Sequence, residues 1–266
     1  MDTAHLKDVT PDTAPPPLSP EVEAAIAALA ERQYRASGLV MKAITFVGGR
    51  VEGGLKALPK GVRGQLDKAA RAALEKSYDL AGRSRGGWGS RIVGPGAHKA
   101  IASVSGALGG LGGLPTALAE LPVTTTVIFR AVQDVAAAHG EDPASVETRL
   151  ECLRVFGAGG PGAEDDGIDT TFIGARLSLT GPAVNAMLAR VAPRFAAMLG
   201  QKLATQAVPV LGAAAGAGTN LAFTAYYVEM AEVHFGLRRL IRAHGEAPVL
   251  DRFHKVLADR TLPAKS

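Results

Sequence analysis

The sequence predicts an all-α fold, a single helical bundle with two Gly/Ala-rich apolar segments. Apolar residues recur at helical spacing along much of the chain, and no run alternates apolar and polar residues as a strand would. The two apolar segments, residues 100–119 and 203–228, contain no charged side chain. Each approaches the length of a bilayer's apolar core, but glycine and alanine also let helices pack very closely. We therefore expect these segments to lie in or beside a membrane.

Residues 1–19 are expected to form a disordered arm, because they contain four prolines, little apolar surface and no helical period. The arm also lacks the apolar core of a secretory signal, which predicts a cytoplasmic protein. The first helix should begin at Ser19-Pro20, since serine can accept a hydrogen bond from the first turn and proline fits that turn. It should continue to Phe46 and break at Gly48-Gly49.

The next helix is predicted over residues 62–81, where apolar and charged residues take opposite faces. Its apolar face should consist of Leu66, Ala70, Ala73 and Leu80, and its charged face of Asp67, Arg71 and Glu75. The basic segment that follows, residues 83–99, contains the only tryptophan and no acid. This composition favours contact with anionic lipid headgroups, although a solvated basic loop would have it too. The membrane-surface candidates are Arg83, Arg85, Trp88, Arg91 and Lys99.

Further helices are predicted in the second half of the chain. The first should start after Pro122, cover residues 123–138, pair Arg130 with Asp134 and stop at Gly140. Others should cover residues 147–156, 171–179, 182–203 and about 218–244, with an acidic, glycine-rich loop over residues 157–169. The helical domain should span residues 20–250, and a short, mostly polar tail should follow over residues 251–266. Cys152, the single cysteine, is expected to be a buried free thiol.

Polar side chains recur along one side of the last long helix. Five of them fall within about 40° of one direction on an unbroken helix. Because an unsatisfied polar group in an apolar medium costs several kcal/mol, this polar stripe should face polar groups. We expect it to face the Thr126 side of the 123–138 helix, either for internal hydrogen bonding or to bind a lipid headgroup or small polar ligand. The candidate ligand-binding residues are Arg130, Gln133, Asp134, Asn220, Thr224, Tyr227, His234 and Arg238.

Two motifs carry a family resemblance. They are GALGGLGGLPTALAELPVTTTVIFRAVQDVAAAHGED and QAVPVLGAAAGAGTNLAFTAYYVEMAEVHFGLRRL. With these motifs the chain resembles the EcsC family over about residues 35–245. The family takes its name from a protein encoded beside an ABC transporter, so the resemblance implies a role near transport and no particular reaction. The two motifs also echo each other, which could mark two equivalent helical units or arise by chance in Ala-rich sequence.

The sequence contains no motif that assigns a reaction. Gly212, Gly216 and Gly218 have the spacing of a dinucleotide-binding turn, but no strand precedes them. The acidic loop lacks the ligand pattern of an EF-hand, and no HExxH, CxxC or GxSxG motif occurs. We therefore expect neither a cofactor nor a metal, and a protein without enzymatic activity. The alternative is a hydrolase or transferase that uses Asp134, Glu229 and His234.

These observations lead to two hypotheses for the function besides that alternative. The first is a membrane-associated helical protein, peripheral or partly inserted at the cytoplasmic face of the inner membrane. Its expected partners are anionic lipids and a membrane transporter complex, in ABC-transporter-linked export or envelope processes. Nucleic acid is not expected, because a single tryptophan in the basic segment offers little for bases to stack on. The second hypothesis is a soluble helical binding module whose Gly/Ala segments form a tightly packed core.

Overall fold

The computed structural model describes residues 17–48, 60–83, 113–157, 181–206 and 212–261, and within these ranges every regular element is an α-helix. The all-α fold is therefore confirmed. The basic segment from Arg85 onward, the acidic loop from residue 158 and the expected 171–179 helix lie outside the described residues. The helices are α1 (Pro20–Gly48), α3 (Lys60–Arg83), α5 (Gly113–Ala138), α6 (Val146–Val155), α7 (Gly181–Gln206), α8 (Gly212–His244) and α9 (Glu246–Thr261).

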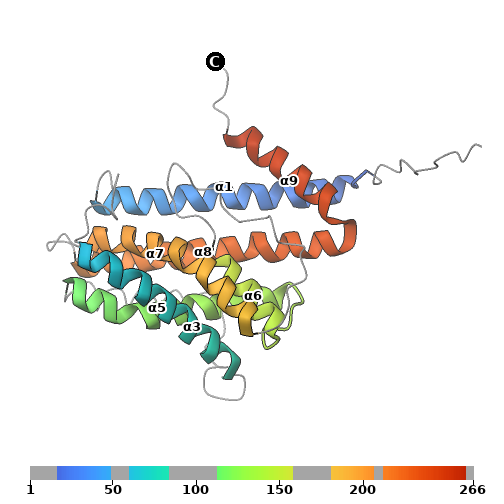
Figure 1. Ribbon diagram of the computed structural model, residues 1–266. Helices are drawn as coiled ribbons and strands as arrows, with labels where there is room; N and C mark the ends of the chain where they lie inside the picture. The colour runs from blue at the N-terminus through green and yellow to red at the C-terminus, as the bar shows by residue number, and fades with distance from the viewer. Residues whose placement is uncertain (1–16, 49–59, 84–112, 158–180, 207–211, 262–266) are drawn as a thin grey trace, which may run out of the picture.

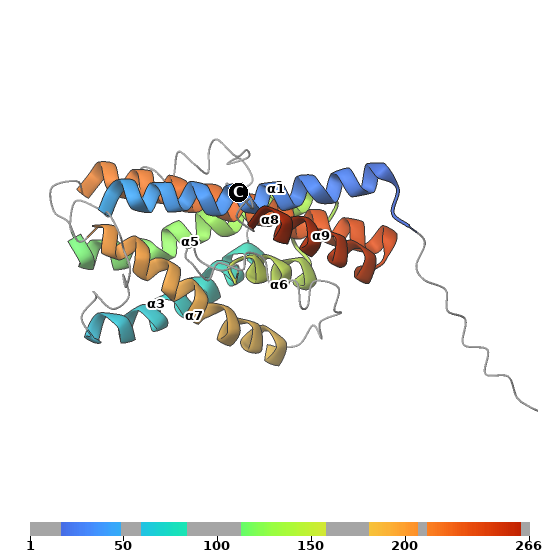
Figure 2. The ribbon, with the colours of Figure 1, turned by 90° about the horizontal axis from the view of Figure 1, so that it is seen from above.

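Helix α8 is the centre of the bundle and contacts α1, α5, α6, α7 and α9. Helices α1 and α9 lie on one side of it, and α3, α5 and α6 lie on the other (Figure 1). Seen from above, α1 runs along α8, and α7 crosses α3 (Figure 2). This arrangement buries α8 over most of its circumference, which explains why its polar side chains need internal partners.

Aromatic rings fill the core where α5, α6, α7 and α8 meet. The ring of Phe156 stacks on Phe129 and Tyr227, with centroids 5.8 and 4.9 Å apart, and meets the edge of Phe195 at 5.2 Å. All four side chains are almost fully buried. Such large, well-packed rings contribute most of the apolar area that stabilises a small core. Cys152 is a buried free thiol, as expected.

Several helix ends match their predicted signals. The Ser19 side chain accepts a hydrogen bond from the Val22 amide at the start of α1, and the helix ends at Gly48. After α5, Gly140 takes a left-handed conformation with φ of 81°. The amide of Glu141 then donates to the carbonyl of Ala136, a pattern that satisfies the last carbonyls of a helix. These ends are therefore set by local sequence.

Three boundaries differ from the prediction. Helix α5 passes through Pro122 instead of starting after it, because packing of the helix against α3 and α8 outweighs one missing backbone hydrogen bond. Helix α8 starts at Gly212 instead of about residue 218, in spite of its glycines. Residues 246–261 form α9 instead of a polar tail, because Val249 and Phe253 are buried against the bundle. Tertiary contacts explain the course of α5 and the presence of α9.

The apolar face predicted for the 62–81 helix is confirmed with one exception. Leu66, Ala70 and Ala73 are buried on α3. Leu80, expected on the same face of α3, is exposed, because it lies near the end of a helix that leaves the bundle there.

Within the described ranges, no helix combines the length and the hydropathy that a bilayer-spanning segment requires.

Candidate functional site

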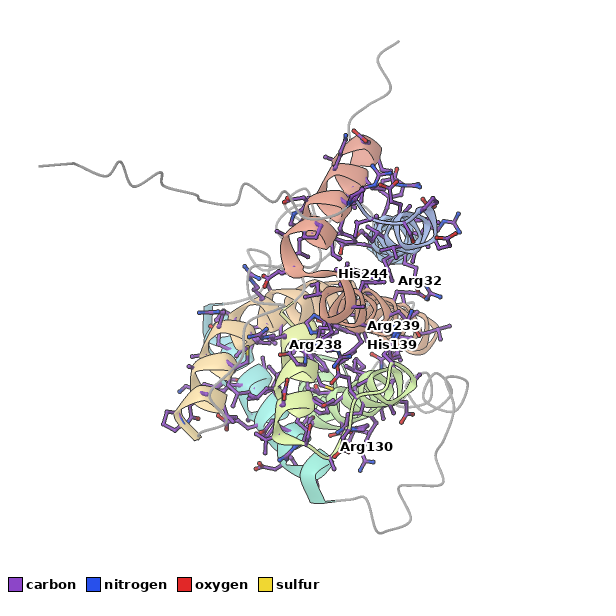
Figure 3. All side chains as sticks on the ribbon, turned by 90° about the vertical axis from the view of Figure 1, so that its right-hand side faces the viewer. Arg32, Arg130, His139, Arg238, Arg239 and His244 are labelled. Carbon is purple, nitrogen blue, oxygen red and sulfur yellow. The ribbon has the colours of Figure 1, made fainter. Side chains whose placement is uncertain are left out.

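The polar stripe on α8 exists and is buried. Asn220, Thr224, Tyr227, His234 and Arg238 lie on one unbroken helix, and each side chain is less than a tenth exposed. Figure 3 shows Arg238 on the side of α8 that faces α6. The stripe divides into two parts with different surroundings, a neutral half near the start of α8 and a charged half near its end.

The charged half centres on Glu151 of α6. The Glu151 carboxylate lies 2.8 Å from His234 Nε2, 3.0 Å from Arg238 Nη1 and 3.5 Å from Arg154 Nη1. The side chains of Glu151 and His234 are each only 1% exposed. A carboxylate so deeply buried would be very costly without cationic partners. We call the group of Glu151, His234, Arg238 and Arg154 the buried ionic cluster.

Other carboxylates surround the same arginine. Arg238 lies 3.3 Å from Glu141 in the turn after α5 and 3.1 Å from Glu147 at the start of α6. Arg242 lies 2.8 Å from Glu141. The cluster and its periphery thus contain equal numbers of carboxylates and guanidiniums. Their charges balance when His234 is neutral.

Burial and charge set the ionisation of the cluster. Burial lowers the pKa of His234 below its ordinary value, and the Glu151 carboxylate only partly offsets this. Burial by itself would raise the pKa of Glu151, but the hydrogen bond from His234 and the charges of Arg238 and Arg154 together hold it below its usual range. At neutral pH, His234 is therefore a neutral imidazole that donates its Nε2 proton to an ionised Glu151.

The neutral half of the stripe faces α5. Asn220 Nδ2 lies 3.5 Å from the hydroxyl oxygen of Thr124, and the Tyr227 ring belongs to the aromatic core. Thr224 Oγ1 and His234 Nδ1 are buried and have no hydrogen-bond partner among the described residues. Unsatisfied buried atoms of this kind are uncommon and call for an explanation.

The side chains expected opposite the stripe mostly point elsewhere. Thr126 contacts Ser77 of α3, and Gln133 donates to the carbonyl of Pro143 in the next turn. Asp134 is exposed, and Arg130 is half-buried and forms no ion pair with any described residue. The expected Arg130–Asp134 pair is therefore absent, in keeping with the few tenths of a kcal/mol that such a surface pair contributes. The partners on α5 and α6 are Thr124 and Glu151 instead, because α5 is rotated so that Thr124 faces α8.

The other candidate groups are not brought together. Asp134 is exposed on α5, Glu229 pairs with Arg32 at 2.9 Å, and His234 is buried against Glu151. Among the described residues, no three His, Cys, Asp or Glu side chains are placed to hold a metal ion. Arg83 is the last residue of α3, and the remaining membrane-surface candidates, Arg85, Trp88, Arg91 and Lys99, lie outside the described residues.

The acidic side of the cluster was not predicted from the sequence, although a signal was present. Glu147, Glu151 and Arg154 follow one another at spacings of four and three residues, which places them on one face of α6. That face is a second polar stripe on a short helix whose other residues, apart from Thr148 and Arg149, are apolar. Two polar stripes in one apolar bundle are expected to pair, so the contact could have been inferred by the argument already applied to α8.

The two motifs and the buried ionic cluster lie largely in the same part of the chain. The model of the EcsC protein family matches residues 65–240, about two thirds of the sequence. The chain belongs to the EcsC family. The matched region of this EcsC protein covers α5, α6 and α7, most of α3 and most of α8, whereas α1 and α9 lie outside it. No curated protein and no solved structure matches the chain.

Proposed function

We propose that this EcsC-family protein associates with the cytoplasmic face of the membrane through one end of its helical bundle. There it serves ABC-transporter-linked export or another envelope process. The supporting observation is the distribution of charge along the bundle, because the ends of α1, α5 and α8 that lie together at one end of it contain very few charged residues.

The C-terminal ends of α1 and α7 and the N-terminal ends of α3, α5 and α8 gather at one end of the bundle (Figures 1 and 2). We call it the glycine end. Residues 212–228 of α8 contain no charge, residues 113–129 of α5 contain only Glu120, and residues 36–48 of α1 contain only Lys42, whereas the start of α3 contains the basic residues Lys60 and Arg63. The buried ionic cluster lies toward the other end. A protein surface with few charges loses little hydration when it enters the headgroup layer of a bilayer.

Exposed apolar side chains lie in the same charge-poor parts of the chain. Val123 of α5 is 52% exposed and Leu221 of α8 is 41% exposed. Their neighbours Thr124 and Asn220 contact each other, so the two apolar residues lie at a similar level along the bundle. Single exposed apolar residues are common on soluble proteins, but their position beside a charge-poor end supports contact with lipid.

Vesicle flotation tests this proposal. The full-length protein should float with vesicles that contain phosphatidylcholine and phosphatidylglycerol, and should float less when the vesicles contain phosphatidylcholine alone. Salt at about 0.5 M should weaken the association, because it screens the attraction between basic residues and anionic headgroups. If the protein stays at the bottom of the gradient with both vesicles at low salt, the proposal is wrong.

A second candidate, a soluble binding module for a small polar ligand, is favoured by the unpaired Thr224 hydroxyl inside the bundle. A bound polar group could satisfy this atom. Native mass spectrometry of the purified protein should then detect a bound small molecule, which Thr224→Val should lose while the protein stays folded. A wild-type mass equal to that of the bare chain would exclude a ligand that survives purification.

A further inference from the structure

Two arginines differ from the others that the structure describes, because they form neither an ion pair nor a hydrogen bond. Nearly all arginines whose side chains the structure describes form an ion pair or a hydrogen bond, as Arg32, Arg71 and Arg252 do. Arg130 of α5 and Arg239 of α8 are the two for which neither is found. Arg239 is exposed and needs no partner other than water. Arg130 is half-buried, so its lack of a partner requires a reason.

Arg130 shares one face of α5 with two valines. Val123, Val127 and Arg130 fall within about 60° of one direction on the helix, and we call them the α5 outer strip. Val123 is the most exposed of the described large apolar side chains, and Val127 is half-buried. Arg130 lies about 10 Å along the helix from Val123, on the side away from the glycine end. Figure 3 shows Arg130 on the side of α5 that is remote from α8.

The chemistry of this strip matches the surface of a bilayer. An arginine can lay its aliphatic stem over apolar neighbours while its charged group remains in the polar layer. Its planar guanidinium forms paired hydrogen bonds with phosphate oxygens, which a solvated point charge cannot do as well. The strip is apolar on the side toward the glycine end and cationic on the side away from it. When the glycine end faces the bilayer, the valines would lie among acyl chains and the arginine at the phosphates.

We propose that the α5 outer strip is the lipid contact of this protein, with Val123 and Val127 reaching the acyl chains and Arg130 binding the phosphate of an anionic phospholipid. This inference rests on the proposed membrane association and adds to it a site and a ligand. Charge complementarity supports it, because Arg130 forms no ion pair with any described carboxylate, Asp134 one turn further along the same face included. The strip is also continuous with the charge-poor start of α5.

Arg239 provides a matched control. It is likewise an arginine without a partner on an exposed helix face, and its loss changes the net charge by the same amount. On α8, however, it lies about 27 Å along the helix from exposed Leu221, and Glu232 lies between them on the same face. Arg239 therefore senses the general electrostatic attraction to a vesicle but does not lie at the end of an apolar strip.

The experiment compares wild type, Arg130→Gln and Arg239→Gln by flotation with vesicles of phosphatidylcholine and phosphatidylglycerol at low salt. We expect Arg130→Gln to lower the partition coefficient about fivefold, the equivalent of one cation at the membrane surface. Arg239→Gln should lower it less than twofold. Val123→Ser should weaken binding to a similar degree as Arg130→Gln, because it removes an apolar side chain from the contact. Circular dichroism should give wild-type spectra for all three variants.

The outcomes separate this inference from the proposed function. If wild type floats and the two arginine variants bind equally, membrane association stands but the α5 outer strip is not its site. If Arg130→Gln binds as wild type does, the same conclusion follows. If wild type itself fails to float, the proposed membrane association is wrong and this inference falls with it.

Discussion

At the scale of single residues, Glu151 organises the charged interior of the protein. It is a buried carboxylate on α6 that accepts hydrogen bonds from His234 and faces the guanidiniums of Arg238 and Arg154. The pKa of Cys152, the next residue, is raised well above its ordinary value by burial and by the nearby carboxylates, so this thiol is unreactive in the folded protein. One carboxylate thus joins α6 to α8.

Glu151→Gln should destabilise the protein strongly. The amide keeps the shape of the side chain but removes the charge, which leaves Arg238 and Arg154 buried without their main anion. Breaking a buried pair in this way costs about 3–5 kcal/mol. Urea unfolding followed by circular dichroism measures the change. Glu75→Gln, which breaks the exposed pair with Arg71, is the control and should cost less than about 1 kcal/mol. Equal effects of the two variants would contradict a central role of Glu151.

Acidification should destabilise the protein, beginning below neutral pH. The unfolded chain protonates His234 near its ordinary pKa of 6.5, whereas burial holds the pKa lower in the folded state. The unfolded state therefore binds more protons as the pH falls through 6.5, and the free energy of unfolding decreases. The lowered pKa of Glu151 adds a further loss below about pH 4.5. Both groups thus act in the same direction.

Urea unfolding at pH 7, 6 and 5 checks this dependence. His234→Gln should reduce the loss of stability between pH 7 and 5, because its side chain does not titrate. His244→Gln, which changes an exposed histidine at the end of α8, should retain the wild-type profile. A wild-type stability that is constant or rises on acidification would show that His234 is not a buried neutral imidazole.

At the scale of elements, one glycine of α8 lies directly against a leucine of α1. A Cβ atom at Gly236 would lie 2.8 Å from Leu29 Cδ2 of α1, too close for two carbons. Gly218, on the same helix, has nothing within 4 Å of the corresponding position. Gly236 therefore allows α8 to pack closely on Leu29, whereas the space around Gly218 would accept a larger side chain.

Alanine substitutions distinguish these roles. Gly218→Ala should raise the free energy of unfolding by up to about 1 kcal/mol, because alanine favours the helix. Gly236→Ala should lose that gain and be about 1–2 kcal/mol less stable than Gly218→Ala, since Leu29 must move to accept the methyl group. Thermal unfolding of both variants in one buffer gives the comparison. Equal stabilisation by both substitutions would mean that α1 and α8 have room between them.

At the scale of the whole molecule, the last described helix, α9, packs against the first, α1. Arg252 and Arg260 of α9 pair with Glu23 and Glu31 of α1, eight residues apart on both helices, so the two helices run parallel. Phe253, the residue after Arg252, belongs to the hydrophobic core and is 1% exposed. Both helices lie outside the region matched to the EcsC family, so they form an additional layer over its central helix.

Phe253→Ala should therefore lower the stability of the entire bundle and leave a single unfolding transition. The loss of a buried aromatic ring costs about 3–5 kcal/mol. Arg252→Ala, on the same helix, removes only a partly exposed ion pair and should cost less than about 1 kcal/mol. Calorimetry measures both variants. A small effect of Phe253→Ala, or a separate early transition, would show that α9 is not part of the cooperative unit.

The residues of the polar stripe on α8 could be predicted from the sequence, but their partners on α5 and α6 could not. The polar stripe on α8 follows from residue spacing alone, and its need for polar partners was expected from the apolar residues around it. The partners were predicted on the wrong residues of α5, because the rotation of one helix against another depends on packing across the whole core. Glu151 was missed for the same reason, although the polar face of α6 was visible in the sequence.

The sequence alone determined the helical class, the family, the amphipathic faces and those helix ends that depend on local signals such as Ser19 and Gly140. These features follow from interactions between residues a few positions apart. Only the tertiary structure decided that α5 continues through Pro122, that the C-terminal residues form α9 and that Glu151 meets His234. Such outcomes depend on burial against distant segments, which contributes more free energy than local preference and cannot be read from spacing along the chain.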